Sequence, residues 1–232
     1  MRVAIMQPYF LPYVGYFQLL AAVDVFVVYD NIKYTKKGWI NRNRFLLNGR
    51  DALFSLPLKK DSDQLDVRDR VLAEDFDRAK LLGRFREAYR RAPFFHEACP
   101  LVESAVLHAE SNLFRYILHS LELLVQHLGI GTRLVVSSAV PADHRLQGEE
   151  KVLAICAELG ATTYINAIGG QGLYSKERFR DRRVELNFLR SAPFTYRQFD
   201  HEFVPWLSIL DVIMFNPPAV LDNYLRTGYT LI

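Results

Sequence analysis

The sequence lacks most of the features that mark secreted, membrane-spanning and metal-binding proteins. Its 232 residues include only two cysteines, Cys99 and Cys156, and neither has a partner at metal-site spacing. Two thiols also make a poor disulfide framework, so both are expected as buried residues in a reducing compartment. No apolar run reaches the roughly 18 to 20 residues that a membrane-spanning helix needs. We therefore expect no metal site and no membrane insertion.

A secretory leader and the common catalytic motifs are missing as well. The chain passes from Arg2 directly into an apolar strand pattern and then into Gln7-Pro8, without a separate basic region, apolar stretch and cleavage site. It contains no GxSxG elbow, no HExxH motif and no kinase motif set. The net charge of +3 gives no overall signature of nucleic-acid binding. These absences favour a cytoplasmic protein that acts on a small molecule by positioning and charge neutralisation.

What is present indicates an α/β fold. Two β-branched runs, Val3–Met6 and Val25–Tyr29, flank an apolar helical pattern over Tyr13–Ala22. Such a βαβ unit implies parallel strands joined by a right-handed crossover. The pattern returns later in the chain, as a strand, a helix stopped by Gly160, and two further strands. These elements are expected at Arg133–Ser137, Gly148–Leu159, Thr162–Asn166 and Val184–Leu189.

The remaining segments predict a hairpin and a helical region. Asn48-Gly49 is a strong hairpin signal, with strands expected over Arg44–Leu47 and Ala52–Leu56. Leu72–Leu128 has helical spacing, and we expect Pro93 and Pro100 to break it into separate helices. Ser111 or Asn112 is the expected N-cap of the last helix. Helices are also expected at Trp206–Phe215 and Ala219–Arg226. We predict one α/β domain over residues 1–232, with residues 70–129 as a mostly helical insertion or lobe.

The first candidate site segment is QPYFLPYVGYF, Gln7–Phe17. Its prolines stiffen the exit from the first strand, and Gly15 leaves room for a close neighbour of the helix backbone. Tyr9, Tyr13 and Tyr16 can stack on a flat ligand, and the helix N-terminus favours an anion. The alternative is an aromatic plug that fills the core beneath a tight turn.

The second candidate segment is DNIKYTKKGWINRN, Asp30–Asn43. Its lysines and Arg42 suit a phosphate or carboxylate, and Trp39 is unusual for a solvated basic loop. An ordinary mobile basic loop is the alternative. A third segment, Ser137–Lys151, carries His144, Arg145 and Lys151 but is a weak signal, because helix capping and solvated charge would explain it.

A fourth segment begins at Asn166 and contains Gly169, Gly170 and Tyr174. A glycine-rich loop after a strand can wrap a phosphate, although this one matches no standard phosphate motif. Gln7, Asp30 and Asn166 all stand at the carboxyl ends of predicted parallel strands. Ligands of open α/β sheets bind beyond those ends, so we expect the three side chains to share one rim.

The motifs QPYFLPYVGYF, KKGWINRNRF, GEEKVLAICAELGATTYIN, GGQGLY and FVPWLSILDVIMFN together resemble the WbqC-like family from end to end. Its members occur in bacterial O-antigen and other surface-polysaccharide gene clusters. The resemblance implies transfer of an aminoacyl group, glycyl in one proposal, onto a sugar. The chain departs from the family at Lys33-Tyr34, where Gln-Tyr is common, and at His144–Gly148, where a Thr-Gly-Lys-Gly type of run is common.

The first strand followed by Pro-x-x-x-Pro-x-x-Gly-aromatic also resembles the nucleotidylyltransferase layout. That resemblance implies a Rossmann-like parallel sheet of the HUP and nucleotidylyltransferase type. In those enzymes a His-x-Gly-His sequence opens the first helix and holds triphosphate. Here the glycine is kept at Gly15, but Pro12 or Tyr13 and Tyr16 replace the histidines. Adenylation by the usual histidines is therefore not expected.

We predict a transferase of surface-polysaccharide precursor synthesis that moves an aminoacyl or similar acyl group to a nucleotide-linked amino sugar. Asp30 and Lys37 are the predicted catalytic residues, with Asp30 better suited to orienting a substrate than to strong basicity. Two alternatives remain open: an adenylating ligase that uses ATP with Mg²⁺, and a non-catalytic binding protein of a glycan assembly complex. The predicted binding residues are Gln7, Tyr9, Gly15, Tyr16, Tyr34, Trp39, Asn41, Arg42, Asn43, Asn166, Gly169, Gly170 and Tyr174.

Overall fold

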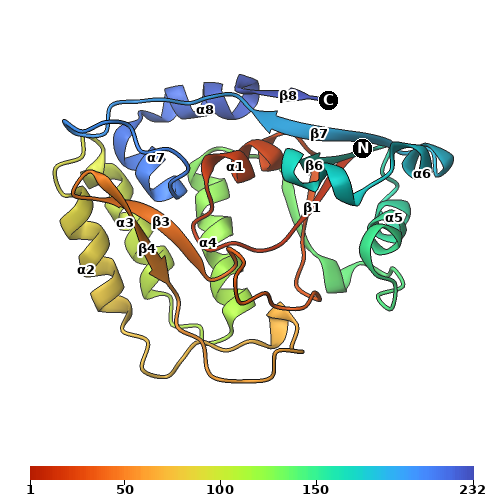
Figure 1. The fold of residues 1–232 in the computed structure, drawn as a ribbon, viewed down its shortest axis with the longest axis horizontal. Coiled ribbons are helices and arrows are strands. Elements are labelled where there is room, and N and C mark those ends of the chain that lie inside the picture. The colour runs from red at the N-terminus through yellow and green to blue at the C-terminus, as the bar shows by residue number, and fades with distance from the viewer.

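A central six-stranded sheet organises the computed structural model, which describes residues 1–232 (Figure 1). The strand order is β5-β2-β1-β6-β7-β8, in which the first five strands are parallel and β8 runs antiparallel to β7. Numbered along the chain, the parallel strands have the order 3-2-1-4-5 of a doubly wound, Rossmann-like sheet. The strands span β1 (Arg2–Met6), β2 (Val25–Val28), β5 (Arg133–Val136), β6 (Thr163–Ala167), β7 (Glu185–Ser191) and β8 (Tyr229–Leu231).

Helices cover both faces of the sheet because the central strands are apolar on both sides. In β1, Val3 and Ile5 pack into a cluster of 14 buried residues, whereas Ala4 packs into a cluster of 49. The smaller cluster lies under α5 (Gly148–Glu158) and α6 (Lys176–Asp181). The helices that contribute to the larger one are α1 (Val14–Ala21), α2 (Arg78–Tyr89), α3 (Phe95–Leu107), α4 (Leu113–His127), α7 (Ile209–Phe215) and α8 (Pro218–Thr227).

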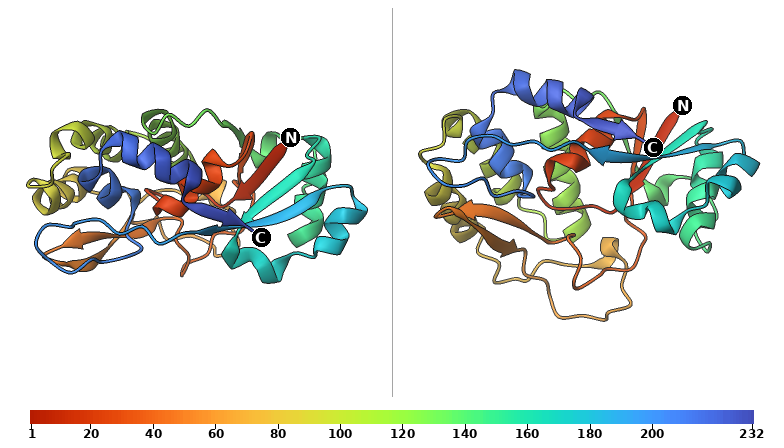
Figure 2. Two further views of the ribbon diagram at one scale, coloured as in Figure 1. Left: turned by 90° about the horizontal axis from the view of Figure 1, so that it is seen from above. Right: turned by 45° about the horizontal axis from the view of Figure 1, so that its top comes forward.

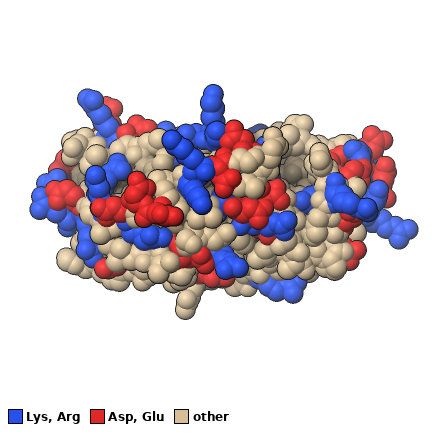
Figure 3. All heavy atoms as spheres, turned by 90° about the horizontal axis from the view of Figure 1, so that it is seen from below, with Lys and Arg blue, Asp and Glu red and all other residues tan.

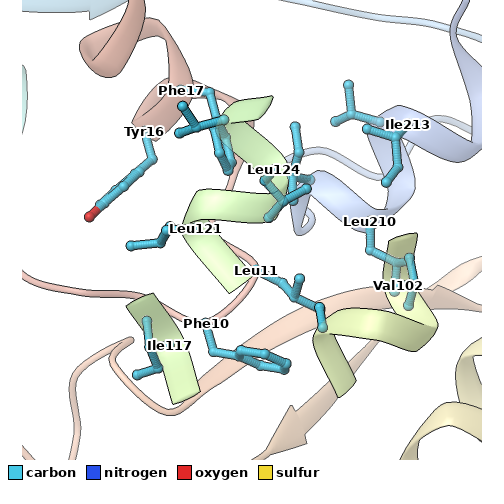
Figure 4. Packing of buried hydrophobic residues seen from close by; sticks show 14 of the residues in the cluster. Phe10, Leu11, Tyr16, Phe17, Val102, Ile117, Leu121, Leu124, Leu210 and Ile213 are labelled. Carbon is cyan, nitrogen blue, oxygen red and sulfur yellow. The ribbon is translucent and has the colours of Figure 1, made fainter. Parts of the chain in front are cut away.

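The larger cluster surrounds α4, whose apolar face meets the bend after β1 (Figure 4). Phe10 and Leu11 of the bend are almost fully buried there, near Ile117 and Leu121 of α4. Leu210 of α7 lies in the same cluster. The bend after β1 therefore supplies core residues as well as the exit from the strand.

A separate hairpin of β3 (Arg42–Leu47) and β4 (Arg50–Ser55) packs against α2. Asn48 and Gly49 turn it with φ angles of 52° and 74°, as a two-residue turn with positive φ at both positions requires. Phe85 of α2 meets Phe45 and Phe54 edge-on, with ring centroids 5.3 and 5.0 Å apart. The predicted hairpin is confirmed, and its aromatic residues fasten it to the helices.

The helical region differs from the prediction at Pro100. As predicted, Asn112 caps α4 by accepting from the Arg115 amide. Pro100, however, lies inside α3 instead of ending it. The apolar face formed by Ala98, Val102 and Ala105 continues across the proline, and its burial compensates for the missing amide donor.

Two differences occur near the C-terminus. Helix α7 begins at Ile209 rather than Trp206, because Trp206 has a positive φ of 62° and the Ser208 hydroxyl caps the Leu210 amide. The short strand β8 was not predicted, since only three residues pair with β7 and nothing in their sequence marks them. The C-terminus follows β8 at this edge of the sheet, whereas the N-terminus begins the central strand β1 (Figures 1 and 2).

The molecule is elongated (Figure 2). Helices α2 and α3 and the hairpin lie at one end, and α5 and α6 lie at the other. On the face shown in Figure 3, Lys and Arg side chains are interspersed with Asp and Glu. None of the helices has the length and apolar character needed to cross a membrane.

Candidate functional site

A large pocket opens beyond the carboxyl ends of β1 and β6, where the order of the sheet reverses. Such topological switch points leave a crevice in which doubly wound proteins bind their ligands. The pocket has a volume of about 930 Å³. Its walls come from the segments after β1, β2 and β6, from the loop that carries Trp39, and from the N-terminal turn of α5. We call it the switch-point pocket.

The bend after β1 divides its aromatic residues between this pocket and the core. Tyr9 and Tyr13 line the pocket beside Gln7, and the Tyr9 hydroxyl donates to Gln7 Oε1 over 3.2 Å. Burial, with a smaller effect of Tyr13, raises the pKa of Tyr9 to about 12, so this hydroxyl stays protonated. Tyr16 instead points into the core and donates to the Gln7 backbone carbonyl over 3.0 Å. The bend therefore places some of its aromatic residues at the pocket wall and others in the core.

Gly15 is buried behind Tyr13. A Cβ atom added there would lie 2.4 Å from the Tyr13 ring and 2.8 Å from Ser191 Oγ. The close neighbour for which this glycine makes room is thus the Tyr13 ring. Gly15 and Tyr16 do not line the pocket; they hold the tyrosines that do.

Asp30 lies behind the pocket wall at the end of β2. Its carboxylate accepts from the Ser138 amide and hydroxyl over 2.9 and 2.6 Å, and Ser137 Oγ lies 2.7 Å away. Burial alone would raise the pKa of Asp30, but these hydrogen bonds outweigh it and hold the pKa below its usual value. The pKa of Asp30 is therefore lowered by two serines and not by neighbouring cations. A carboxylate held in this way joins β2 to β5 and is a weak base.

The neighbouring Asn31 binds a buried cation, the Lys151 ammonium, at the pocket wall. Lys151 Nζ donates to the Asn31 backbone carbonyl over 2.9 Å and to Asn31 Oδ1 over 3.2 Å. Lys151 is only 6% exposed, and burial lowers its pKa although Asp66 and Asp30 act in the opposite direction. An ammonium has three donors, so one remains for a ligand. The Tyr29 ring lies beneath Nζ, with its centroid 5.0 Å away.

His144 completes this side of the pocket. Its Nε2 lies 2.9 Å from the Val140 carbonyl, which can only accept, so Nε2 carries the proton. Its Nδ1 therefore accepts from Asn31 Nδ2, 2.9 Å away. Both ring nitrogens are occupied, and His144 orients Asn31 instead of offering a free base.

The loop between β2 and β3 places only part of its predicted set in the pocket. Trp39 lines the pocket and Lys33 joins it, while Lys37 is exposed outside it. Arg42 donates to the Gly38 carbonyl, over 2.8 Å, and to the Lys37 carbonyl, and its guanidinium lies 5.5 Å from the Trp39 ring centroid. It therefore supports Trp39.

Three further members of the predicted set hold the chain in place. Asn41 donates to the Leu56 carbonyl over 2.7 Å and accepts from the Tyr34 hydroxyl over 2.9 Å. Asn43 donates to the Leu11 carbonyl over 2.8 Å. Asn43 thus ties the hairpin to the bend after β1, Asn41 joins the loop to the end of β4, and none of the three lines the pocket.

The glycine-rich segment after β6 forms the opposite wall. Asn166, Gly169, Gly170 and Tyr174 all line the pocket. A Cβ on Gly170 would lie 2.7 Å from Asn166 Nδ2, so the glycine lets the backbone pass directly over this amide. Gln7 and Asn166 thus share the predicted rim, and Asn31 occupies the place at the end of β2 that was assigned to Asp30.

The acidic side chains in the N-terminal turn of α5 pair with another cation and do not neutralise the buried Lys151. Glu149 and Glu150 lie in that turn but pair with Arg178 of α6. No group of three or more His, Cys, Asp or Glu side chains is placed to hold a metal ion. The sequence marked Lys151 only weakly and did not mark Asn31, because only folding brings a helix residue beside the end of a distant strand.

A comparison with protein families matches residues 7–223 to the WbqC-like protein family. The chain belongs to the WbqC-like family. It is also 30% identical over 231 residues to the uncharacterized protein Rv1507c of Mycobacterium tuberculosis (strain ATCC 25618 / H37Rv), covering 97% of each chain. No solved structure matches it.

Several WbqC-like motifs meet at the switch-point pocket. QPYFLPYVGYF supplies Gln7, Tyr9 and Tyr13, GEEK supplies Lys151, and GGQGLY supplies the glycines and Tyr174. The WbqC-like motif FVPWLSILDVIMFN lies elsewhere, in α7 and the segment before it. Residues of these motifs therefore lie both at this pocket and in one further region.

Proposed function

We propose that this protein is a cytoplasmic transferase of surface-polysaccharide precursor synthesis, and that it moves an aminoacyl or similar acyl group onto a nucleotide-linked amino sugar. The observation that carries the proposal is the buried Lys151 ammonium, which has a donor to spare at the N-terminal turn of α5 in a pocket of about 930 Å³. A buried cation at a helix N-terminus favours phosphate, because the cation and the free backbone amides both attract negative charge.

The other walls suit the uncharged parts of such a substrate. Tyr9, Tyr29, Trp39 and Tyr174 offer flat faces on which a base or a sugar ring can stack. Gln7 and Asn166 offer amide groups for hydroxyls or base edges. A pocket of this volume falls within the usual range for ligands of this size, roughly 300 to 1,000 Å³.

The proposed reaction needs an activated acyl donor, which we take to be an ester or thioester. The sugar amine forms a bond to the acyl carbon, and the bond from that carbon to the donor's oxygen or sulfur breaks. The amine proton ends on that leaving group. The pocket contributes by holding the diphosphate at Lys151 and the amine beside the donor, which converts an encounter of two molecules into a reaction within one complex.

The experiment is a binding and transfer assay on Lys151→Met, which keeps the apolar stem and removes the charge. Loss of a charged hydrogen bond of about 1.5–3 kcal/mol is expected to weaken binding of UDP-linked amino sugars about 10- to 100-fold. Lys80→Met, an exposed lysine of α2, is the matched control and should bind as the wild type does. Isothermal titration gives the affinities, and mass spectrometry detects the acylated sugar.

Failure of every nucleotide-linked sugar to bind the wild type would refute the proposal. Binding without acyl transfer from any ester or thioester would leave the non-catalytic alternative. An adenylating ligase is the second candidate, favoured by the strand order, which places the pocket where doubly wound sheets bind nucleotides. That candidate predicts release of pyrophosphate from ATP and Mg²⁺ when an amino acid is present.

A further inference from the structure

A second pocket, of about 390 Å³, lies between the start of α1, the end of β7 and the segment that leads to α7. We call it the aromatic pocket. None of its lining residues is charged, and six of them carry aromatic rings: Tyr13, Phe194, Tyr196, Phe203, Trp206 and Tyr224. Tyr13 lines this pocket and the switch-point pocket as well, so the two are neighbours.

Buried hydrogen bonds hold the outer wall of the aromatic pocket in place. Asp211 of α7 is fully buried and accepts from the Tyr196 hydroxyl and from Gln198 Nε2, each over 2.6 Å. Gln198 also accepts from the Val204 amide over 2.7 Å. The segment from Tyr196 to Val204 is therefore fixed to α7, and the pocket has a defined shape.

Trp206 stands at the mouth of this pocket without a role in the core. It is 65% exposed, and its backbone has a φ of 62°, a strained conformation for a bulky residue. Its ring lies 6.2 Å from that of Tyr13, and Arg44 holds its backbone carbonyl. An exposed tryptophan kept in a strained backbone gives the fold little, and strain of this kind is concentrated at ligand sites.

The polar atoms of the aromatic pocket define what it can hold. The hydroxyls of Tyr196 and Tyr224 already donate to Asp211 and to the Ala192 carbonyl. Only the hydroxyls of Tyr13, Ser191 and Thr195 are left without a partner in the protein. A phosphate or a carboxylate would find no cation there, and a sugar would leave most of its hydroxyls unpaired. The lining suits an apolar group with one or two polar atoms.

We propose that the aromatic pocket holds the apolar body of the acyl group that is transferred. This assignment rests on the proposed function and extends it, because it predicts a branched or aromatic acyl group, larger than glycyl. The shared Tyr13 places such a group next to the nucleotide-sugar, so that polar and apolar parts of the reactants occupy neighbouring pockets.

The two tryptophans of the chain allow each pocket to be observed separately. Trp39→Phe leaves Trp206 as the reporter of the aromatic pocket, and Trp206→Phe leaves Trp39 as the reporter of the switch-point pocket. The probes are phenylacetamide and isovaleramide, which carry an apolar body on a neutral amide, together with acetamide and UDP-N-acetylglucosamine.

We expect phenylacetamide and isovaleramide to change the Trp206 emission saturably, whereas acetamide at the same concentrations does not. Ala192→Leu, which fills the pocket, should weaken this binding about tenfold or more. Ala157→Leu, the same change at an exposed position of α5, should not. Thermal unfolding of both variants checks that they are folded.

No saturable Trp206 response to either apolar amide, or equal binding by the Ala192→Leu variant, would overturn the inference. In that case a Trp39 response to the nucleotide-sugar would still support the proposed function. The reverse result, amide binding in a protein that binds no nucleotide-sugar, would overturn the assignment to an acyl donor along with the proposed function.

Discussion

At the scale of single residues, the switch-point pocket depends on side chains that act through one another. Asp30 fixes the start of the Ser137–Ala139 turn, His144 orients Asn31, and Asn31 holds Lys151. Residues that the sequence marked for their chemistry, such as Asp30 and Arg42, thus support others that face the pocket. A residue type shows what a side chain can do, but its neighbours determine whether a ligand can reach it.

Gly170 offers a test at this scale. Gly170→Ala places a methyl group 2.7 Å from Asn166 Nδ2 in the present geometry, so the Asn166 amide must move. Because the segment is at the surface, we expect a change in unfolding free energy below about 1 kcal/mol. Nucleotide-sugar affinity should fall about fivefold or more, as measured by isothermal titration.

Gly172→Ala is the matched control, since no atom lies within 4 Å of its added Cβ and Gly172 does not line the pocket. It should bind almost as the wild type does. Equal losses in the two variants would show that Asn166 does not bind the ligand.

At the scale of elements, helix and strand positions followed the periodicity of the sequence, while their ends followed local capping. Asn112 begins α4 and Gly160, with a φ of 66°, follows the end of α5, both as predicted. Pro100 did not end α3, because the buried face of this helix extends across it. Packing of an amphipathic face can outweigh one lost hydrogen bond.

Pro100→Ala is expected to stabilise the protein. The substitution restores an amide donor in the interior of α3, where proline is about 3 kcal/mol less favourable than alanine. Greater freedom of the unfolded chain offsets about 0.4–1 kcal/mol of this gain. Pro100 is exposed, so little packing is lost, and urea denaturation should show a gain of about 1–3 kcal/mol.

Pro218→Ala provides the control for Pro100→Ala. Pro218 is the first residue of α8, a position where proline is well tolerated because its missing amide has no partner in the helix. This variant should be no more stable than the wild type. A similar gain in unfolding free energy in both variants would show that the position of the proline in its helix does not cause the effect.

At the scale of the whole molecule, one buried carboxyl group joins distant parts of the chain and makes stability depend on pH. Asp211 accepts from Tyr89 of α2, over 3.0 Å, and from Tyr196 and Gln198 of the segment after β7. Burial raises the pKa of Asp211 from 3.8 to about 6, although these three hydrogen bonds act in the opposite direction. The folded state therefore binds the Asp211 proton more tightly than the unfolded state does.

The sign of the effect follows from this difference. Above pH 6 the ionised, buried Asp211 carboxylate lowers the free energy of unfolding. This destabilisation disappears as the pH falls from about 6 toward 4 and the carboxyl group becomes protonated. The shift corresponds to about 3 kcal/mol at most. Asp30, whose pKa is lowered, acts in the opposite sense, and its contribution is lost only below the ordinary carboxyl range. Urea denaturation at pH 7 and pH 5 should show that this part of the pH dependence is absent from Asp211→Asn.

Tyr196→Phe gives a second measurement should Asp211→Asn fail to fold. Removing a donor to the ionised carboxylate raises the pKa of Asp211 further, so the pH-dependent change should move to higher pH. An unchanged pH profile in this variant would show that Asp211 does not titrate in the range considered.

The sequence by itself determined the parallel sheet, the hairpin and the family, because these follow from local periodicity, turn residues and long motifs. It also determined that Gln7 and Asn166 stand at strand ends. The tertiary structure alone decided that Lys151 and Asn31 meet, that Asp30 is covered by serines, and that Tyr13 lines two pockets. Such contacts join residues far apart in the chain, and they depend on strand order and side-chain direction, which a local pattern does not contain.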